Sequence, residues 1–355
     1  MPSQPAGTAE VFPRLRPLMF SIAYRMLGSV AEAEDIVQEA FLRYHRAVAG
    51  PAGVESPKAF LSAVTTRLSI DELRSARVRR ESYPGEWLPE PVLTSAGAPS
   101  GPGPTAVGSG QAAGPEADPA AAAEQADSLS MAFLLVLERL SPVERAVFLL
   151  HDVFSYGYDE IAGIVGKTED NCRQLATRAR RHVTAGKPRF EVSRRKREEL
   201  ASRFFQAVGD GDMDGLVAML AEDVVMYGDS GGVSPSWPRP IIGRGKVIRL
   251  VATLGEQIRT LSITVRPAEV NGQPGGICLD RDGQLINVFA LDIADGQVQV
   301  IRSVISRDKL RHLGPLADVP GLVAQLRGRR VNAIRASRLG QPLMLISHRA
   351  ARRRA

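Results

Sequence analysis

The stretch Tyr158–Val183, YDEIAGIVGKTEDNCRQLATRARRHV, decides how the middle of this 355-residue chain folds. Its apolar residues recur at helical spacing on both sides of Gly166, which predicts two short helices joined by a tight turn. Gly166 suits the left-handed conformation that ends the first helix, and the Thr168 side chain can cap the second by accepting from a free backbone amide. The pattern predicts a helix-turn-helix, although an ordinary helical hairpin with a basic, solvated face fits the same spacing.

The second of these helices is rich in side chains that contact DNA. Asn, Gln and Arg bind base edges through paired hydrogen bonds, and Arg also binds phosphates. We expect Asn171, Arg173 and Gln174, which lie in the first turns, to contact bases. Arg178 and Arg181 are expected to hold phosphates.

Composition limits the class of protein. The net charge is +6, but the tail from residue 317 carries nine arginines and one aspartate, so the rest of the chain sums to −2. A DNA-binding claim must therefore rest on local clusters of arginine. Two distant cysteines imply no disulfide framework, and neither a membrane span nor a signal peptide is evident, so we expect a cytoplasmic protein.

The N-terminal half reads as two helical modules. Helices are predicted over Val11–Leu27, Ala31–Val48 and Pro57 to about Arg80, and helical periodicity resumes over residues 127–185. Between the modules, residues 94–123 consist mainly of Gly, Pro, Ala and Ser, which predicts a flexible linker. The linker is long enough for the modules to hold separate segments of a ligand.

The C-terminal half has a different pattern. Two helices, Glu198–Val208 and Met213–Leu220, precede the β-type runs, which indicates an α+β domain with a curved antiparallel sheet. The predicted strands are Val224–Tyr227, Leu261–Val270, Gly275–Leu279, Leu285–Asp292 and Val298–Ile305.

Three segments resemble a known family. Ser21–Ala47 (SIAYRMLGSVAEAEDIVQEAFLRYHRA) resembles the core-polymerase-binding segment of sigma-70-type initiation factors, and Ser56–Arg80 resembles their promoter-melting, minus-ten segment. Leu137–Val183 looks like their minus-thirty-five-binding region 4. Because the other sigma regions are absent, the resemblance is to the extracytoplasmic-function (ECF) class.

The rest of the chain resembles the ECF group, SigJ-type factors included, that is fused to a SnoaL-like domain, a cone-shaped fold similar to nuclear transport factor 2. Trp87–Pro91 (WLPEP) matches the linker motif of that group. Two motifs depart from it. Asp229–Gly232 reads Asp-Ser-Gly-Gly where the group has Asp followed by three glycines, and Ser306–Leu310 reads Ser-Arg-Asp-Lys-Leu where the group has Asn-Pro-Asp-Lys-Leu.

The implied fold is two all-α sigma domains, the second with the helix-turn-helix, and an α+β SnoaL-like cone. The predicted boundaries are 8–82 for sigma-70 region 2, 83–126 for the linker with WLPEP, 127–186 for region 4, 197–316 for the SnoaL-like domain and 317–355 for a basic tail.

The resemblance implies four sets of site residues. Polymerase binding is expected from Asp35, Gln38, Glu39 and Phe41, on a helix with an acidic side. Minus-ten binding is expected from Arg67, Asp71, Arg74, Arg77, Arg79 and Arg80, with Ser62, Thr65 and Thr66 able to touch bases or sugars. Minus-thirty-five binding is expected from Thr168, Asn171, Arg173, Gln174, Thr177, Arg178 and Arg181. Regulatory contact is expected from Trp87, Leu88, Pro89, Asp229, Gly231, Gly232, Asp308, Lys309 and Leu310.

The predicted function is that of a sigma factor regulated in cis by its SnoaL-like domain, with core RNA polymerase (β′ clamp and β flap) and promoter DNA as partners. No cofactor, metal, membrane or separate anti-sigma factor is required, and the chain itself is expected to catalyse nothing. Two alternatives remain: a DNA-binding repressor that ignores polymerase, and a SnoaL-like enzyme or ligand sensor fused to a DNA-binding region. The acidic helix argues against the first, and the lack of histidine between Glu198 and Arg311 weakens an enzyme.

Overall fold

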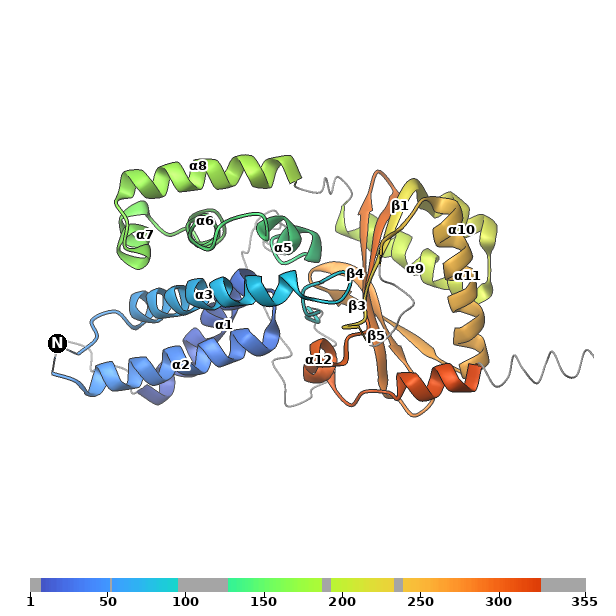
Figure 1. The fold of residues 1–355 in the computed structure, drawn as a ribbon, viewed down its shortest axis with the longest axis horizontal. Coiled ribbons are helices and arrows are strands. Elements are labelled where there is room, and N and C mark those ends of the chain that lie inside the picture. Colours follow the sequence, from blue (N-terminus) through green and yellow to red (C-terminus); the bar gives the residue numbers. More distant parts are fainter. Residues whose placement is uncertain (1–7, 52, 95–126, 187–192, 233–238, 327–355) are drawn as a thin grey trace, which may run out of the picture. The chain divides into compact units, whose positions relative to one another are not determined.

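The computed structural model describes residues 8–51, 53–94, 127–186, 193–232 and 239–326 (Figure 1). The predicted linker over residues 94–123 falls almost wholly outside these ranges, as does most of the basic tail. The chain divides into two units, residues 1–317 and 318–355.

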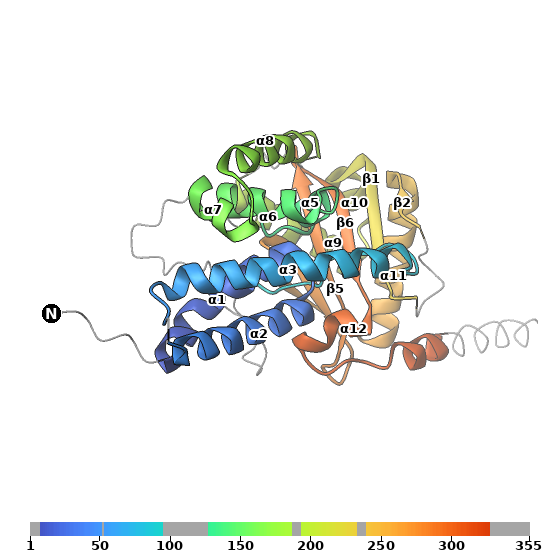
Figure 2. The ribbon, with the colours of Figure 1, turned by 60° about the vertical axis from the view of Figure 1, so that its left-hand side comes forward.

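The first helical module consists of three helices that lie side by side in both ribbon views (Figures 1 and 2): α1 (Thr8–Leu27), α2 (Val30–Ala49) and α3 (Pro57–Glu81). Gly28, in the left-handed region at φ +67°, separates the first two helices. The side chains of Ser29 and Ser56 then cap α2 and α3 by accepting a hydrogen bond from the backbone amide of the third residue of each helix. The local sequence thus fixes where each helix begins.

The second helical module contains the helix-turn-helix. Its elements are α5 (Met131–Leu137), α6 (Pro142–Phe148), the π-helix η1 (Leu149–Val153), α7 (Tyr158–Val165) and α8 (Glu169–Gly186). Gly166 adopts φ +67° at the end of α7, and the Asn171 amide donates to Thr168 Oγ1 at 3.3 Å at the start of α8. Both predictions about this turn are confirmed.

The two helical modules share one hydrophobic core. A single cluster of buried residues runs from Val11 in α1 through Tyr44 in α2 and Leu61 in α3 to Phe148 in α6 and Cys172 in α8. The sequence predicts two separate modules, and the structure instead packs them against each other. Helical periodicity reports that a helix has an apolar face, but it does not report which neighbour covers that face.

The C-terminal α+β domain has one mixed sheet of six strands in the order β2-β1-β6-β5-β4-β3. Its helices are α9 (Arg194–Asp210), α10 (Met213–Met219), α11 (Arg244–Leu261) and the short α12 (Arg307–Leu310), which a 3-10 turn, η2 (Arg311–Leu313), follows. Its strands are β1 (Leu220–Asp229), β2 (Ile241–Ile242), β3 (Thr264–Val270), β4 (Gln273–Leu279), β5 (Leu285–Ala294) and β6 (Gln297–Val304).

Two predictions for this domain are wrong. The sheet is not wholly antiparallel, because β1 pairs in parallel with β6. Helix α11 was also missed, although Val247, Val251, Leu254, Ile258 and Leu261 recur at helical spacing. Strand direction depends on which strands become neighbours, and no local pattern encodes that choice.

Both faces of the sheet are buried, by different parts of the chain. Along β5, Phe289 and Leu291 contact the cluster formed with α9, α10 and α11, which cover one face (Figure 1). The alternating Val288 and Ala290 belong to a second cluster on the other face. That second cluster also contains Met131 from α5, Leu310 from α12, and Leu88 and Leu93 from residues 87–94, which we call the WLPEP segment after the motif that begins it. The C-terminal sheet therefore completes its core with residues from the N-terminal half.

Candidate nucleic-acid interface and interdomain site

The recognition helix α8 presents its predicted DNA-binding residues on one exposed face. All seven of them are exposed, while Cys172, Ala176 and Ala179 on the opposite face are buried. An open hollow of about 430 Å³ lies along this face, lined by Arg173, Gln174, Thr177, Arg178 and Arg181. The structure thus brings the minus-thirty-five set together on one surface.

Ion pairs hold several of these arginines in place. Arg173 pairs with Glu169 at 2.8 Å and with Asp170 at 2.9 Å, and Arg178 lies 3.5 Å from Glu144. These pairs are exposed at the arginine end, where an ion pair contributes little stability. Bases or phosphates of DNA can therefore replace the carboxylates as partners of these arginines at small cost.

Helix α2 carries the predicted polymerase-binding residues on its outer side. Asp35 and Gln38 are exposed, and Glu39 pairs with Arg43 at 2.8 Å. Phe41 is half-buried, with its ring centroid 4.4 Å from that of Phe12. Leu42, which lies one turn beyond Gln38 and is 51% exposed, was not among the predicted residues. Its i+4 spacing from Gln38 was the available signal.

The predicted minus-ten residues are less available. Asp71 and Arg74 form an exposed pair at 3.0 Å. Arg67, however, donates to the backbone carbonyls of Ile164 at 2.8 Å and Gly163 at 2.7 Å, both in α7. The side chains of Arg77 and Arg79 lie outside the described residues.

Arg80 points inward rather than toward solvent. Its guanidinium donates to Glu138 at 2.5 Å and to the Leu27 carbonyl, and lies 3.9 Å from the centre of the Trp87 ring. Only 14% of its side chain is exposed. In this conformation Arg80 joins the two helical modules and is not free to bind a phosphate.

The short polar residues of α3 are buried. Ser62, Thr65 and Thr66 are each 0% exposed, whereas the sequence suggested contact with bases or sugars. The Ser62 hydroxyl hydrogen-bonds to that of Tyr156 in the second helical module at 2.6 Å. Within the described ranges, the Oγ1 atoms of Thr65 and Thr66 have no hydrogen-bond partner. Part of the predicted DNA-binding face is therefore covered here.

A buried ion pair within the C-terminal domain, between Asp229 and Lys309, hydrogen-bonds to the segment after α3. The Asp229 carboxylate, at the end of β1, accepts from Lys309 Nζ at 2.6 Å, from Tyr83 Oη at 2.6 Å and from the Leu88 amide at 2.8 Å. Lys309 Nζ also donates to the Leu88 carbonyl at 2.5 Å. We call these four residues, Tyr83, Leu88, Asp229 and Lys309, the clasp.

Burial sets the electrostatics of the clasp. Asp229 is 0% exposed and Lys309 is 7% exposed. Desolvation lowers the pKa of Lys309, and the neighbouring Asp229 carboxylate counteracts that shift. The Lys309 ammonium lies 4.6 Å from the centre of the Tyr83 ring and 4.5 Å from that of Trp87. The aromatic faces thus compensate part of the lost hydration.

The Asp-Ser-Gly-Gly turn fits closely under this segment. Gly231 and Gly232 have φ +60° and +78°, which glycine adopts without strain. A Cβ at Gly232 would lie 2.8 Å from Pro84 Cγ, and one at Gly231 would lie 2.7 Å from Ser306 Oγ. Space and backbone conformation both require glycine here.

The remaining predicted regulatory residues divide into two groups. Leu88, Pro89 and Leu310 are buried, and Trp87 is half-buried beside Gly28. Asp308 instead is exposed and pairs with Arg311 at 2.7 Å. The structure therefore leaves Asp308 outside the contact.

Glu90 was missed as a site residue, although it lies within WLPEP. Its carboxylate accepts from the Ser29 hydroxyl at 2.8 Å and from the Val30 amide at 2.8 Å, so it binds the positive end of α2. Burial raises the pKa of Glu90, and these hydrogen bonds oppose the shift. The linker motif thus caps the helix that carries the predicted polymerase-binding residues.

Asn271, at the tip of the β3–β4 hairpin, was also missed. Its Nδ2 donates to Tyr24 Oη in α1 at 2.7 Å and to the Leu129 carbonyl at 3.0 Å, and its Oδ1 accepts from the Val92 amide at 2.9 Å. The side chain is 0% exposed. One residue of the C-terminal domain therefore binds both helical modules and the WLPEP segment. The Asn271-Gly272 dipeptide signals a turn in the sequence, but nothing about these partners.

Comparison with known proteins identifies the family. Residues 11–79 match the family described as Sigma-70 region 2, and residues 130–183 match Sigma-70, region 4. Over 306 residues the chain is 36% identical to the ECF RNA polymerase sigma factor SigJ of Mycobacterium tuberculosis, a match that covers 84% of this chain and 91% of that protein. The chain belongs to the ECF sigma factors.

One further relative and one crystal structure agree with this assignment. The sigma factor is 30% identical over 295 residues to the probable ECF RNA polymerase sigma factor SigI of the same organism, covering 83% of this chain and 92% of that protein. It is also similar to the crystal structure of M. tuberculosis SigJ, with a TM-score of 0.64 at 34% identity, covering 87% of this chain and 99% of that one.

The first helical module of the sigma factor is therefore region 2, and the second is region 4. The C-terminal domain is of the predicted α+β class, with helices and one six-stranded sheet. As a sigma factor the chain binds core RNA polymerase and promoter DNA in transcription initiation and is not itself an enzyme. None of the described helices has the length and hydropathy of a membrane span.

Proposed function

We propose that the SnoaL-like domain regulates this sigma factor in cis by stabilising a closed state. The closed state is defined by contact between α3 of region 2 and the helix-turn-helix of region 4, with Ser62 on Tyr156 and Arg67 on the α7 carbonyls. In an open state these contacts are broken, and α3 becomes available to promoter DNA.

The covered face of α3 supports this proposal. Leaving a buried hydroxyl without a hydrogen bond costs about 1–3 kcal/mol. The Thr65 and Thr66 hydroxyls carry that cost here, within the described part of the chain. Such unpaired hydroxyls are expected on a surface that binds a polar partner in the active state of the protein. Promoter DNA is a polar partner of this kind.

The observation that carries the proposal is the set of bonds made by Asn271. Its side chain contacts Tyr24 of region 2, Leu129 at the start of region 4 and Val92 of the WLPEP segment. These bonds exist only when all three parts are together, so they stabilise the closed state and not the open one. The clasp adds a second connection, from Asp229 and Lys309 to Leu88.

In the open state we propose that the exposed surfaces act as the sequence predicts. Asp35, Gln38, Glu39 and Phe41 then bind the clamp helices of the polymerase β′ subunit, and Leu42 extends this surface. Region 4 binds the β flap and, through the exposed face of α8, the minus-thirty-five element. Because the regulator is part of the same chain, no separate anti-sigma factor is needed.

Run-off transcription tests the regulatory claim. With core polymerase and a promoter recognised by this factor, Lys309→Met removes the cation of the clasp and leaves the Asp229 carboxylate buried with uncharged donors. Breaking a buried ion pair in this way costs about 3 kcal/mol, so we expect more initiation at a limiting concentration of sigma factor. The matched control is Arg311→Met, which breaks an exposed pair with Asp308 worth at most about 1 kcal/mol.

The two halves of the function separate in this assay. If both variants and the unsubstituted chain initiate equally while all three melt cooperatively, regulation by the SnoaL-like domain is refuted and the sigma activity stands. Affinity for core polymerase, measured alongside, shows whether opening also strengthens binding through the exposed side of α2.

A further inference from the structure

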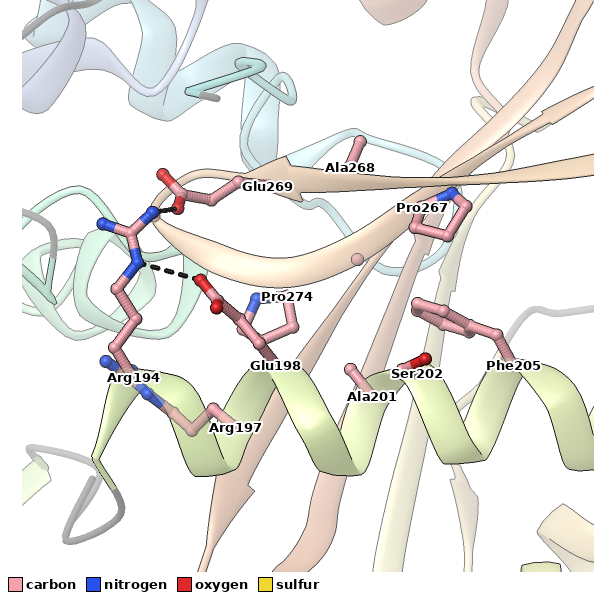
Figure 3. Close-up of a pocket in the computed structure, with 12 residues that line it drawn as sticks. Arg194, Arg197, Glu198, Ala201, Ser202, Phe205, Pro267, Ala268, Glu269 and Pro274 are labelled. Atoms are coloured by element: carbon pink, nitrogen blue, oxygen red, sulfur yellow. Dashed lines mark hydrogen bonds and ion pairs between the residues drawn. The ribbon is translucent and has the colours of Figure 1, made fainter. Parts of the chain in front are cut away.

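A cavity lies inside the SnoaL-like domain, between α9 and the β3–β4 hairpin (Figure 3). Its volume is about 270 Å³, which suits a small ligand of about two aromatic rings. The walls away from the helix start are apolar and include Ala201 and Phe205 from α9 and Pro267, Ala268 and Pro274 from the hairpin.

The other end of the cavity is lined by two arginines, Arg194 and Arg197, and by two glutamates, Glu198 and Glu269. Helix α9 begins with four consecutive cations, Arg194 to Arg197, and has no acidic residue in its first turn. The start of a helix is the positive end of its dipole, so cations are unfavourable there and an anion is favourable. Glu198 and Glu269 offset part of this charge, both through Arg194 (Figure 3).

We propose that this cavity binds a small organic anion, a carboxylate or sulfonate on an apolar body of one or two rings. The anionic group pairs with Arg194, and the apolar body packs against Phe205 and Pro274. The Arg194 side chain is 67% exposed, so its guanidinium can turn from Glu269 to the ligand at little cost.

The cavity shares residues with the interdomain contacts, and this part of the inference rests on the proposed function. Glu269 accepts from Thr94 Oγ1 at 2.6 Å at the end of the WLPEP segment. Arg197 donates to Gln273 at 2.9 Å and lies 3.5 Å from Asp127, just before region 4. When the ligand pairs with Arg194, the Glu269 carboxylate loses its cation at this junction. Because the Arg194 end of the pair is exposed, we expect this loss to favour the open state by at most about 1 kcal/mol. Ligand binding is thereby coupled to opening.

Fluorescence titration of the full chain tests the site. The probe is 5-(dimethylamino)naphthalene-1-sulfonate, and the corresponding sulfonamide has the same two rings without the charge. We expect one molecule of the sulfonate per chain, bound about tenfold more tightly than the neutral analogue. Arg194→Gln should remove that advantage, whereas Arg195→Gln should not, because Arg195 has the same i,i+4 pairing with a glutamate but does not line the cavity.

A second pair of variants tests the location. Ser202→Trp places a large ring in the cavity from its exposed rim and should abolish sulfonate binding. Gln206→Trp, on the same helix but outside the cavity lining, should leave it intact. Equal affinity for the two probes, equal effects of the two arginine variants, or undiminished binding to Ser202→Trp would each overturn the proposed site.

Hydrogen exchange of the Leu88 amide tests the coupling. This amide is bonded to Asp229 in the clasp, outside the cavity. Saturating sulfonate should speed its exchange in the unsubstituted chain and leave it unchanged in Ser202→Trp. If the sulfonate binds as described but the exchange rate stays the same, the coupling is refuted. Failure of the proposed regulation itself appears separately, in the run-off assay of Lys309→Met.

Discussion

Substitution of Asn271 by glycine should loosen the closed state without straining the hairpin. Asn271 has φ +53°, a conformation that glycine adopts without strain and alanine does not. Asn271→Gly therefore keeps the turn and removes only the side chain. Its effect reports the side-chain contacts alone.

The expected magnitude follows from the bonds that are lost. The Asn271 side chain makes three buried hydrogen bonds, to Tyr24, Leu129 and Val92. Each contributes about 1 kcal/mol net, so their loss weakens the closed state by about 3 kcal/mol. That free energy corresponds to a roughly 100-fold shift toward the open state.

Exchange of the Leu88 amide measures this shift. The amide donates to Asp229 at 2.8 Å and does not contact Asn271, so it reports opening of the whole junction rather than the local loss. In the regime where closing is faster than exchange, we expect its exchange to accelerate about 100-fold in Asn271→Gly.

The control is Asp295→Gly, in the β5–β6 hairpin. Asp295 has φ +52°, is exposed and precedes a glycine, as Asn271 does. This variant should leave the Leu88 exchange rate unchanged. If Asn271→Gly speeds exchange of the Val92 amide but not that of Leu88, the hairpin tip and the clasp open independently, and the reasoning that they hold one closed state is refuted.

Two further predictions concern the edges of the same contact. Gly232→Ala should weaken the closed state by about 1–2 kcal/mol more than Gly283→Ala. Both glycines have positive φ, but only a Cβ at Gly232 would contact Pro84. Equal acceleration of Leu88 amide exchange in the two variants would contradict this prediction. Burial lowers the pKa of His312, whose Nε2 donates to the Pro91 carbonyl at 2.8 Å. On acidification the unfolded chain therefore binds a proton at this histidine before the folded chain does. The free energy of unfolding falls as the pH drops below 6.5, the usual pKa of histidine. The melting temperature should therefore fall less on acidification in His312→Gln, and an identical pH profile would count against the assignment.

The helix-turn-helix shows what a local pattern can establish. Gly166 and Thr168 were predicted to end one helix and cap the next, and both do so. Capping and left-handed turns depend on residues within a few positions of one another, so the sequence contains the whole cause. The helices of region 2 follow the same logic, with Ser29 and Ser56 at their starts.

The partners of polar residues could not be predicted in this way. Arg67 and Arg80 were expected to face DNA, and both instead bind other parts of the chain. Asn271 reads only as a turn residue, yet it connects the three parts of the molecule. A buried polar side chain has no periodic signature, because its partner can come from any distance along the sequence.

The amino-acid sequence by itself determined the helical modules, the exposed polar face of α8 and the family, because these depend on local spacing and on contiguous motifs. Only the tertiary structure decided that regions 2 and 4 share one core, that β1 runs parallel to β6, and that the second face of the SnoaL-like sheet is covered by the WLPEP segment. Each of these features is a contact between segments that are far apart in the chain. The apolar area and the hydrogen bonds that stabilise such a contact exist only after the segments have come together.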